Sequence, residues 1–150
     1  MTLPPHTPRE PVATPSLPDG IEFRLCPPLS DDELNALFGA AWPAHQPRAF
    51  APVLARSLAW IGGFADGALA GFVNLAWDGG AHVFLLDTTV HPRYQRRGVG
   101  TDLVRRALTA AGESGAEWLH VDYEPHLDGF YRRCGFRPTR AGLIQLRKGS

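Results

Sequence analysis

The sequence predicts a single α/β (α+β) domain with one mixed, mostly antiparallel sheet and helices packed against it. Its 150 residues suit one domain, and 44% of them are hydrophobic, which is enough for a core. Apolar segments at residues 58–64, 69–77 and 82–90 are separated only by short turns, which predicts an antiparallel meander. An amphipathic segment at 98–111 and an apolar segment at 118–123 then predict a right-handed crossover between two parallel strands.

The domain is expected to span residues 21–150, with an arm at residues 1–20 in front of it. The arm holds six prolines and almost no bulky apolar side chains. Such a composition is typical of a disordered or extended segment, because it offers little surface to bury.

The first elements of the domain follow from local patterns. Residues 21–25 alternate between apolar and charged side chains, as in a half-buried strand. Ser30 and Glu33 have the spacing of a capping box, which predicts a helix that Pro43 limits. Residues 44–57 leave the choice open between a loop and a short helix in the second half of the segment.

Turn residues and periodicity place the elements of the second half. Asp66-Gly67 is a hairpin turn pair, and Asp78-Gly79-Gly80 forms a further turn. The amphipathic segment places its apolar residues on one stripe, which predicts a helix that Gly112 ends. After the crossover we expect, in order, a short helix at residues 127–134 and a strand at residues 143–146 that closes the sheet.

Charge and cysteine content exclude several classes of protein. Fifteen basic and fifteen acidic residues balance, so no overall field attracts nucleic acid or a membrane surface, and neither partner is expected. Cys26 and Cys134 are isolated thiols rather than a disulfide framework, which predicts a reduced, cytoplasmic setting. The sequence shows no apolar run of membrane-spanning length and no signal-peptide pattern.

The most informative segment is residues 91–101, between the third strand of the meander and the amphipathic helix. Free N–H groups at a helix start bind anions, and glycines at positions 98 and 100 let a ligand approach the backbone. Arginines can add charge-assisted hydrogen bonds to phosphate. The alternative is that the two glycines serve tight packing of helix against sheet. Five arginines cluster in and after this segment: Arg93, Arg96, Arg97, Arg105 and Arg106.

Two motifs resemble those of the GNAT superfamily of acyl-CoA N-acyltransferases. Gln95-x-x-Gly98-x-Gly100, preceded by Val90-His91-Pro92, is similar to the superfamily's [Q/R]-x-x-G-x-[G/A] motif and its lead-in. The block from Phe130 to Phe136 is similar to its F/L-Y-x-x-x-G-F segment. The resemblance covers roughly residues 21–147.

The resemblance implies acetyl-CoA as co-substrate, bound at the centre of the sheet. The parallel strands would splay apart near Val90 and Tyr123, and the pantetheine arm would bond to the backbone near Thr88 and Val90. The Val90 N–H would polarise the acetyl carbonyl. The segment that would hold the pyrophosphate consists of Gln95, Arg96, Arg97, Gly98, Val99, Gly100 and Thr101.

The resemblance also suggests catalytic residues. Tyr131 matches the superfamily's tyrosine near the CoA sulfur, where it would protonate the departing thiolate; the alternative is a purely structural core aromatic. For the base, Asp87 is the acid nearest the usual glutamate position. Glu124 stands where an asparagine is common, which predicts either a carboxylate facing the substrate or a solvent-facing loop residue.

Other candidates carry less weight. Acidic and histidine side chains recur at every second residue from His120 to His126, a pattern that could ligate a metal. Pro125 interrupts this ladder, and we expect no metal. Cys134 lacks a patterned base and is expected to pack beside Gly135. Trp42 and residues 45–50 are expected to cover a partly apolar acceptor site.

The predicted function is direct transfer of an acetyl group from acetyl-CoA to a primary amine in a ternary complex. A small-molecule amine is preferred over a protein, because the sequence shows no long charged groove. The main alternative is a non-catalytic CoA-binding sensor or regulatory module, and a nucleic-acid-binding module ranks third. A homodimer remains open.

Overall fold

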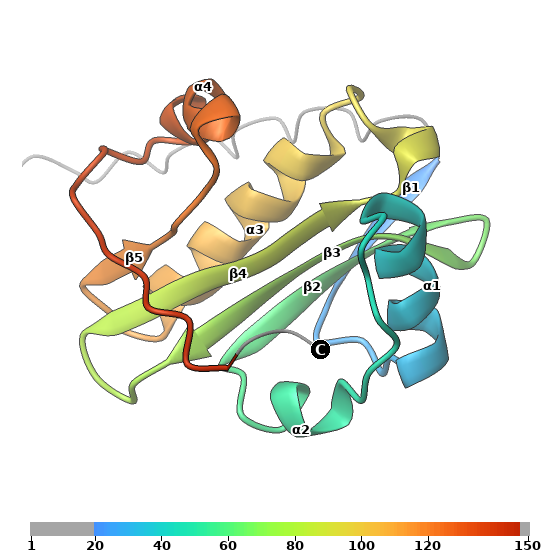
Figure 1. Cartoon of the computed structure of the whole chain (residues 1–150), viewed down its shortest axis with the longest axis horizontal. Helices are drawn as coiled ribbons and strands as arrows, with labels where there is room; N and C mark the ends of the chain where they lie inside the picture. The colour runs from blue at the N-terminus through green and yellow to red at the C-terminus, as the bar shows by residue number, and fades with distance from the viewer. Residues whose placement is uncertain (1–19, 148–150) are drawn as a thin grey trace, which may run out of the picture.

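The computed structural model describes residues 20–147 of the chain. The predicted arm at residues 1–20 therefore lies, except for Gly20, outside the described residues. A five-stranded sheet in the order β1-β2-β3-β4-β5 forms the centre of the fold (Figure 1). The elements are β1 (Ile21–Leu25), α1 (Asp31–Ala41), α2 (Ala51–Leu54), β2 (Ala59–Ala65), β3 (Ala68–Trp77), β4 (His82–Val90), η1 (Pro92–Tyr94), α3 (Val99–Glu113), β5 (Trp118–His120), η2 (Pro125–Leu127) and α4 (Asp128–Arg133).

The sheet is mixed, as predicted. Strands β1 to β4 pair antiparallel in sequence order, and β4 pairs with β5 in parallel. The hairpin between β2 and β3 turns at Asp66 and Gly67, whose φ angles are 48° and 78°. Positive φ at both central residues is what a tight type I′ turn requires, so the Asp-Gly pair specifies this turn.

The parallel pair is splayed. Strands β4 and β5 pair only from His82↔Trp118 to Phe84↔His120, whereas β4 continues to Val90. Beyond Phe84, this edge of β4 has no strand beside it among the described residues. The C-terminal half of β4 therefore keeps a free edge, which is the opening that the site uses.

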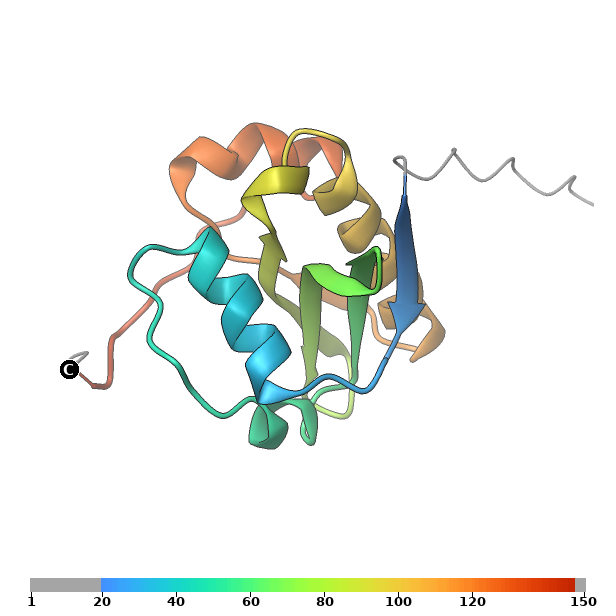
Figure 2. The same cartoon turned by 90° about the vertical axis from the view of Figure 1, so that its right-hand side faces the viewer.

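Helices cover both faces of the sheet (Figure 2). Helix α3 covers one face and buries residues that include Val99, Leu103 and Ala107 in the main core. Helix α1 covers the other face, where Leu34 and Phe38 pack against Phe72 of β3 in a second cluster. The sheet thus divides the core into two layers, one under α3 and one under α1.

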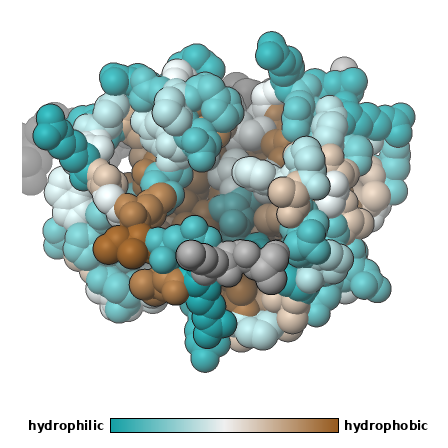
Figure 3. Space-filling model, in the orientation of Figure 1, coloured by the Kyte–Doolittle hydropathy of each residue, from teal (hydrophilic) through white to brown (hydrophobic). Residues whose placement is uncertain are grey.

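The expected strand at residues 143–146 is wrong. Leu143, Ile144 and Leu146 are 82%, 87% and 92% exposed, and this described segment has no strand conformation. It runs from α4 past β5 towards α2, and Figure 3 shows exposed apolar surface on this face of the molecule. A strand requires a neighbouring strand to complete its hydrogen bonds, and apolar composition alone does not supply one.

Candidate active site

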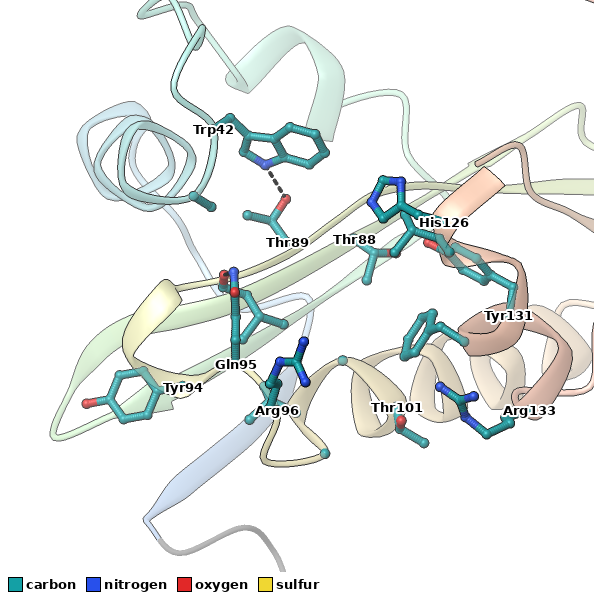
Figure 4. A pocket seen from close by; sticks show the side chains of 17 residues that line it. Trp42, Thr88, Thr89, Tyr94, Gln95, Arg96, Thr101, His126, Tyr131 and Arg133 are labelled. Atoms are coloured by element: carbon teal, nitrogen blue, oxygen red, sulfur yellow. Dashed lines mark hydrogen bonds between the residues drawn. The ribbon is translucent and has the colours of Figure 1, made fainter. Parts of the chain in front are cut away.

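A cavity of about 770 Å³ opens at the C-terminal end of β4. It extends between the end of α1, the start of α3 and the η2–α4 segment (Figure 4). Two predicted site residues from β4, Thr88 and Val90, line it together with Tyr131 of α4. The predicted residues that line it from the η1–α3 loop and α3 are Gln95, Arg96, Gly98, Val99, Gly100 and Thr101.

A β-bulge shapes the β4 side of the cavity. The register between β3 and β4 shifts between Phe72 and Asn74, and Asp87 has a φ of 57°. A bulge bends its strand and re-aims the side chains that follow it. Past this point the Thr89 hydroxyl accepts a hydrogen bond from the Trp42 indole at 3.2 Å and donates to the Asp87 carbonyl at 2.9 Å. The bulge therefore ties the strand to the end of α1.

The start of α3 has the backbone geometry that suits an anion. Gly98 is the N-cap of this helix and has a left-handed φ of 83°, and Arg96 has a φ of 61°. Together with the unpaired first N–H groups and the dipole of a long helix, this loop suits a phosphate. The Gln95 side-chain amide donates to the Val90 carbonyl at 3.0 Å, which fixes the loop to the end of β4.

The two glycines of this loop act differently. A Cβ atom on Gly98 would meet nothing within 4 Å, so its positive φ is the reason for glycine there. A Cβ on Gly100 would lie 3.4 Å from the Phe130 ring and 3.7 Å from Val90, which is ordinary contact. Gly100 lines the cavity, so larger side chains at this position would project into the space beside these two residues.

Arg97 does not line the cavity, unlike its neighbour Arg96. Its guanidinium lies 5.9 Å from the centre of the Tyr94 ring, where cation–π attraction can hold it, and Arg93 lies at the same distance. Arg133 of α4, which the sequence did not single out, lines the cavity instead. Positive charge thus reaches the cavity from two elements.

Tyr131 is both packed and accessible to the cavity. The residue is 6% exposed and its ring stacks on Tyr123 at 4.7 Å, with Phe130 and Phe136 edge-on against it. Burial raises the pKa of the Tyr131 phenol, while the nearby Thr88 hydroxyl acts in the opposite direction. The phenol therefore stays protonated at neutral pH and can donate a proton.

The two predicted acids do not line the cavity. Glu124 is exposed just before η2. Asp87 lies on the bulge, where packing around its carboxylate raises the pKa and the Arg48 guanidinium lowers it. His126 does line the cavity, beside Thr88 and Tyr131 in Figure 4. The sequence presented His126 only as part of an interrupted metal ladder; its place just before the Tyr131 helix was the available signal.

Metal chemistry has no assembled ligand set in the part of the chain that the structure describes. Among residues 20–147 no group of three or more metal-binding side chains comes together. From the ladder, His120 lies close to one other potential ligand, His82, whose Nδ1 is 2.8 Å from the His120 Nε2. Trp42, expected to cover the acceptor, lies at the cavity wall, half exposed.

The residues present fit an acyl-CoA molecule. The cavity joins an anion-binding helix start to a free strand edge and ends near the Tyr131 phenol. The buried Thr88 hydroxyl in its wall has no hydrogen-bond partner among the described residues, as expected of a group that meets a ligand. Within the same residues, no helix has the length and apolar composition needed to cross a membrane.

Comparison with known proteins agrees with this geometry. The model of the Acetyltransferase (GNAT) family matches residues 30–136. The chain therefore belongs to the GNAT acetyltransferase family. A GNAT-family acetyltransferase of Streptococcus pneumoniae TIGR4 superimposes with a TM-score of 0.73 at 26% identity, over 86% of this chain and 99% of the other.

Two further comparisons bear on function. The mycothiol acetyltransferase of Nocardia farcinica is 40% identical over 83 residues, which are 55% of this chain and 27% of that protein. The chain thus matches only about a quarter of this longer relative. The structure of aminoglycoside N-acetyltransferase AAC(6')-Iy in complex with CoA has a TM-score of 0.66 at 20% identity, over 86% of this chain and 95% of the other, which shows the fold alone.

Proposed function

We propose that this protein transfers an acetyl group from acetyl-CoA to a primary amine of a small molecule, by direct attack in a ternary complex. The observation that carries the proposal is the continuity of the cavity. One space is lined at one end by the start of α3 and at the other by the buried, protonated phenol of Tyr131. Acetyl transfer needs both ends, one to bind the phosphates and one to release the thiolate.

The phosphate end is assigned to α3 and its loop. The backbone N–H groups of residues 98–101 and the side chain of Arg96 bind the pyrophosphate, with Arg133 on the opposite wall. Arg97, which points away onto Tyr94, contributes mainly to the local positive potential. Gln95 keeps the loop against β4. Val99 and Thr101 form part of the cavity wall at the start of α3.

The acyl end is assigned to β4. Because β5 separates from β4 after Phe84, the edge of β4 near Thr88 and Val90 is free to hydrogen-bond the pantetheine amides. The Val90 N–H polarises the acetyl carbonyl and stabilises the negative charge that develops on its oxygen. This arrangement uses the splay of the sheet as the binding slot.

The proton transfers are assigned to two side chains. Tyr131 gives its phenolic proton to the sulfur as the C–S bond breaks. Asp87, which does not line the cavity, receives through water the proton that the attacking amine loses, and desolvation of its carboxylate favours this role because it raises the pKa. Glu124, exposed ahead of η2, attracts the cationic amine from the rim.

A small amine is the proposed acceptor. Trp42 gives the cavity an apolar wall, and no peptide-length charged groove is evident from the sequence. Relatives named for acetylation of mycothiol and of aminoglycosides agree with a small acceptor. The amine screen described next is needed to identify the acceptor of this chain.

The proposal is tested by combining a binding measurement with an amine screen. Acetyl-CoA and CoA at millimolar concentration should raise the melting temperature, because a ligand that binds only the native state stabilises it. Thiol release in an amine library should then identify the acceptor. A melting shift without turnover in any amine would favour the CoA-binding sensor, and no shift at all would refute the acetyl-CoA assignment.

A further inference from the structure

The Thr88 hydroxyl is a buried polar group with no assigned task. Its oxygen has no hydrogen-bond partner within residues 20–147, although the residue lines the cavity. Most buried hydroxyl groups in proteins are hydrogen-bonded, so an exception in a cavity wall needs an explanation. The neighbouring Thr89 hydroxyl, by comparison, is fully engaged with Trp42 and the Asp87 carbonyl.

The bulge in β4 brings Thr88 to this position. Val83 and Leu85, two residues apart, are buried in the core under α3, so strict alternation would direct Thr89 to that face as well. The register shift at Asp87 reverses this order. Both threonines line the cavity, but Thr89 meets Trp42 of the α1 layer, whereas Thr88 lies on the side of Tyr131 (Figure 4). A strained, positive-φ residue is thus placed where it turns the Thr88 side chain towards the Tyr131 side of the cavity.

Thr88 and Tyr131 line the same cavity and lie next to each other in Figure 4, although no hydrogen bond joins their hydroxyls in the structure. Thr88 lies near enough to lower the pKa of the Tyr131 phenol against the larger effect of burial. Tyr131 cannot readily move towards another partner, because Tyr123, Phe130 and Phe136 pack around its ring. The ring is therefore fixed, and only the direction of the phenolic proton is left to be set.

We propose that Thr88 is a positioning residue that donates a hydrogen bond to the Tyr131 oxygen and thereby directs the phenolic proton at the departing sulfur. This inference rests on the proposed acetyl transfer. A tyrosine oxygen that accepts a hydrogen bond on one side directs its own O–H towards the other. Thr88 thus acts through Tyr131, in addition to the contact that its backbone makes with the substrate.

The proton balance is closed. The amine nitrogen forms the new bond to the acetyl carbon, the C–S bond breaks, and Tyr131 gives its proton to the sulfur. The resulting phenolate accepts a hydrogen bond from Thr88 and regains a proton, equivalent to the one that the amine lost, through solvent. The net products are one amide and one free thiol, and Thr88 keeps its proton throughout.

The first test is a titration without acetyl-CoA. Tyr131 can be followed by NMR of ring-labelled tyrosine and assigned with the Tyr131→Phe variant. Thr88→Val keeps the side-chain shape but removes the donor to the phenolate, so the pKa of Tyr131 should rise. Thr88→Ser should leave it near the wild-type value. Thr109→Val, which removes an exposed hydroxyl on α3, is the matched control and should have no effect. An unchanged Tyr131 pKa in Thr88→Val would overturn the inference.

The second test is kinetic and uses the acceptor found in the amine screen. Thr88→Val should lower kcat about tenfold with little change in the KM for acetyl-CoA, and Thr88→Ser should restore most of the rate. In a Tyr131→Phe background, Thr88→Val should cause no further loss, because both act on one proton. Full additivity, or wild-type turnover in Thr88→Val, would refute the positioning role while leaving the acetyltransferase assignment intact. No wild-type turnover or acetyl-CoA binding would instead refute the proposed function.

Discussion

Tyr131 belongs both to the packed core and to the wall of the cavity. Its ring contributes to the core through three aromatic neighbours, while the residue also lines the cavity. Packing fixes the ring, and a fixed ring is what a proton donor needs if its geometry is to be reproducible. The structural and the catalytic interpretation of this tyrosine are therefore compatible. The variants described above test the catalytic interpretation.

The glycine pair provides a prediction at the same scale. Gly100→Val should abolish the acetyl-CoA-induced rise in melting temperature while the protein stays folded, because branched methyl groups would project into the cavity. Gly98→Ala should instead lower stability by about 1–2 kcal/mol through its left-handed backbone. Thermal unfolding with and without acetyl-CoA measures both effects.

Gly112→Val is the control for that experiment. A Cβ at Gly112 meets nothing within 4 Å, and the residue does not line the cavity. It should bind acetyl-CoA like the unmodified protein. Normal acetyl-CoA binding by Gly100→Val would mean that this glycine serves only the packing of α3.

Helix α1 connects a local sequence signal to the site. At its start, the Ser30 hydroxyl accepts from the Glu33 N–H at 3.1 Å and the Glu33 carboxylate accepts from the Ser30 N–H at 2.8 Å. At its end lies Trp42, whose indole donates to Thr89 on β4. A capping box that fixes where the helix begins therefore also helps to fix where the cavity wall lies.

Removal of this cap gives a prediction at the scale of the element. Ser30→Ala should lower the free energy of unfolding by about 1 kcal/mol, because the Glu33 N–H at the helix start loses the hydroxyl that caps it. Chemical denaturation measures the change. Ser57→Ala, which removes a hydroxyl bonded to the Val53 carbonyl, is the comparison and should cost less. Equal losses in the two variants would argue against a specific contribution of the capping box.

Elements that depend on neighbours close in sequence were predicted better than elements that depend on distant ones. The capping box and the Asp66-Gly67 turn are complete within a few residues and are confirmed. Strand β5 is shorter than the predicted 118–123, and residues 143–146 are not a strand, because each needs a partner that periodicity does not identify.

At the scale of the molecule, the site exists only where distant segments meet. Trp42 and Arg133 line one cavity although strands β2 to β5 lie between them in sequence. The splay between β4 and β5 provides the free edge, and α3 provides the helix start. The described domain accounts for all of these parts, which leads to a prediction about the arm ahead of it.

Removal of residues 1–18 should leave the melting temperature, the acetyl-CoA shift and turnover nearly unchanged. The six prolines and few apolar residues of the arm give it little to bury. Removal of residues 1–26 is the control and should destabilise the protein strongly, because β1 pairs with β2 along its whole length. A large loss of activity after the shorter deletion would assign the arm to the acceptor site or to a dimer.

The sequence by itself determined the fold class, the order of nearly all elements and the glycine-containing segment at the start of α3 that lines the cavity. Each of these depends on spacing along the chain, such as the glycines at 98 and 100 before an amphipathic helix. Only the tertiary structure decided which side chains face the cavity. It turned Arg97 away, brought in His126 and Arg133, and used one bulge at Asp87 to give Thr88 and Thr89 different partners within the cavity wall. The reason is physical: the direction of a side chain depends on backbone register and on contacts between distant segments, which residue spacing does not encode.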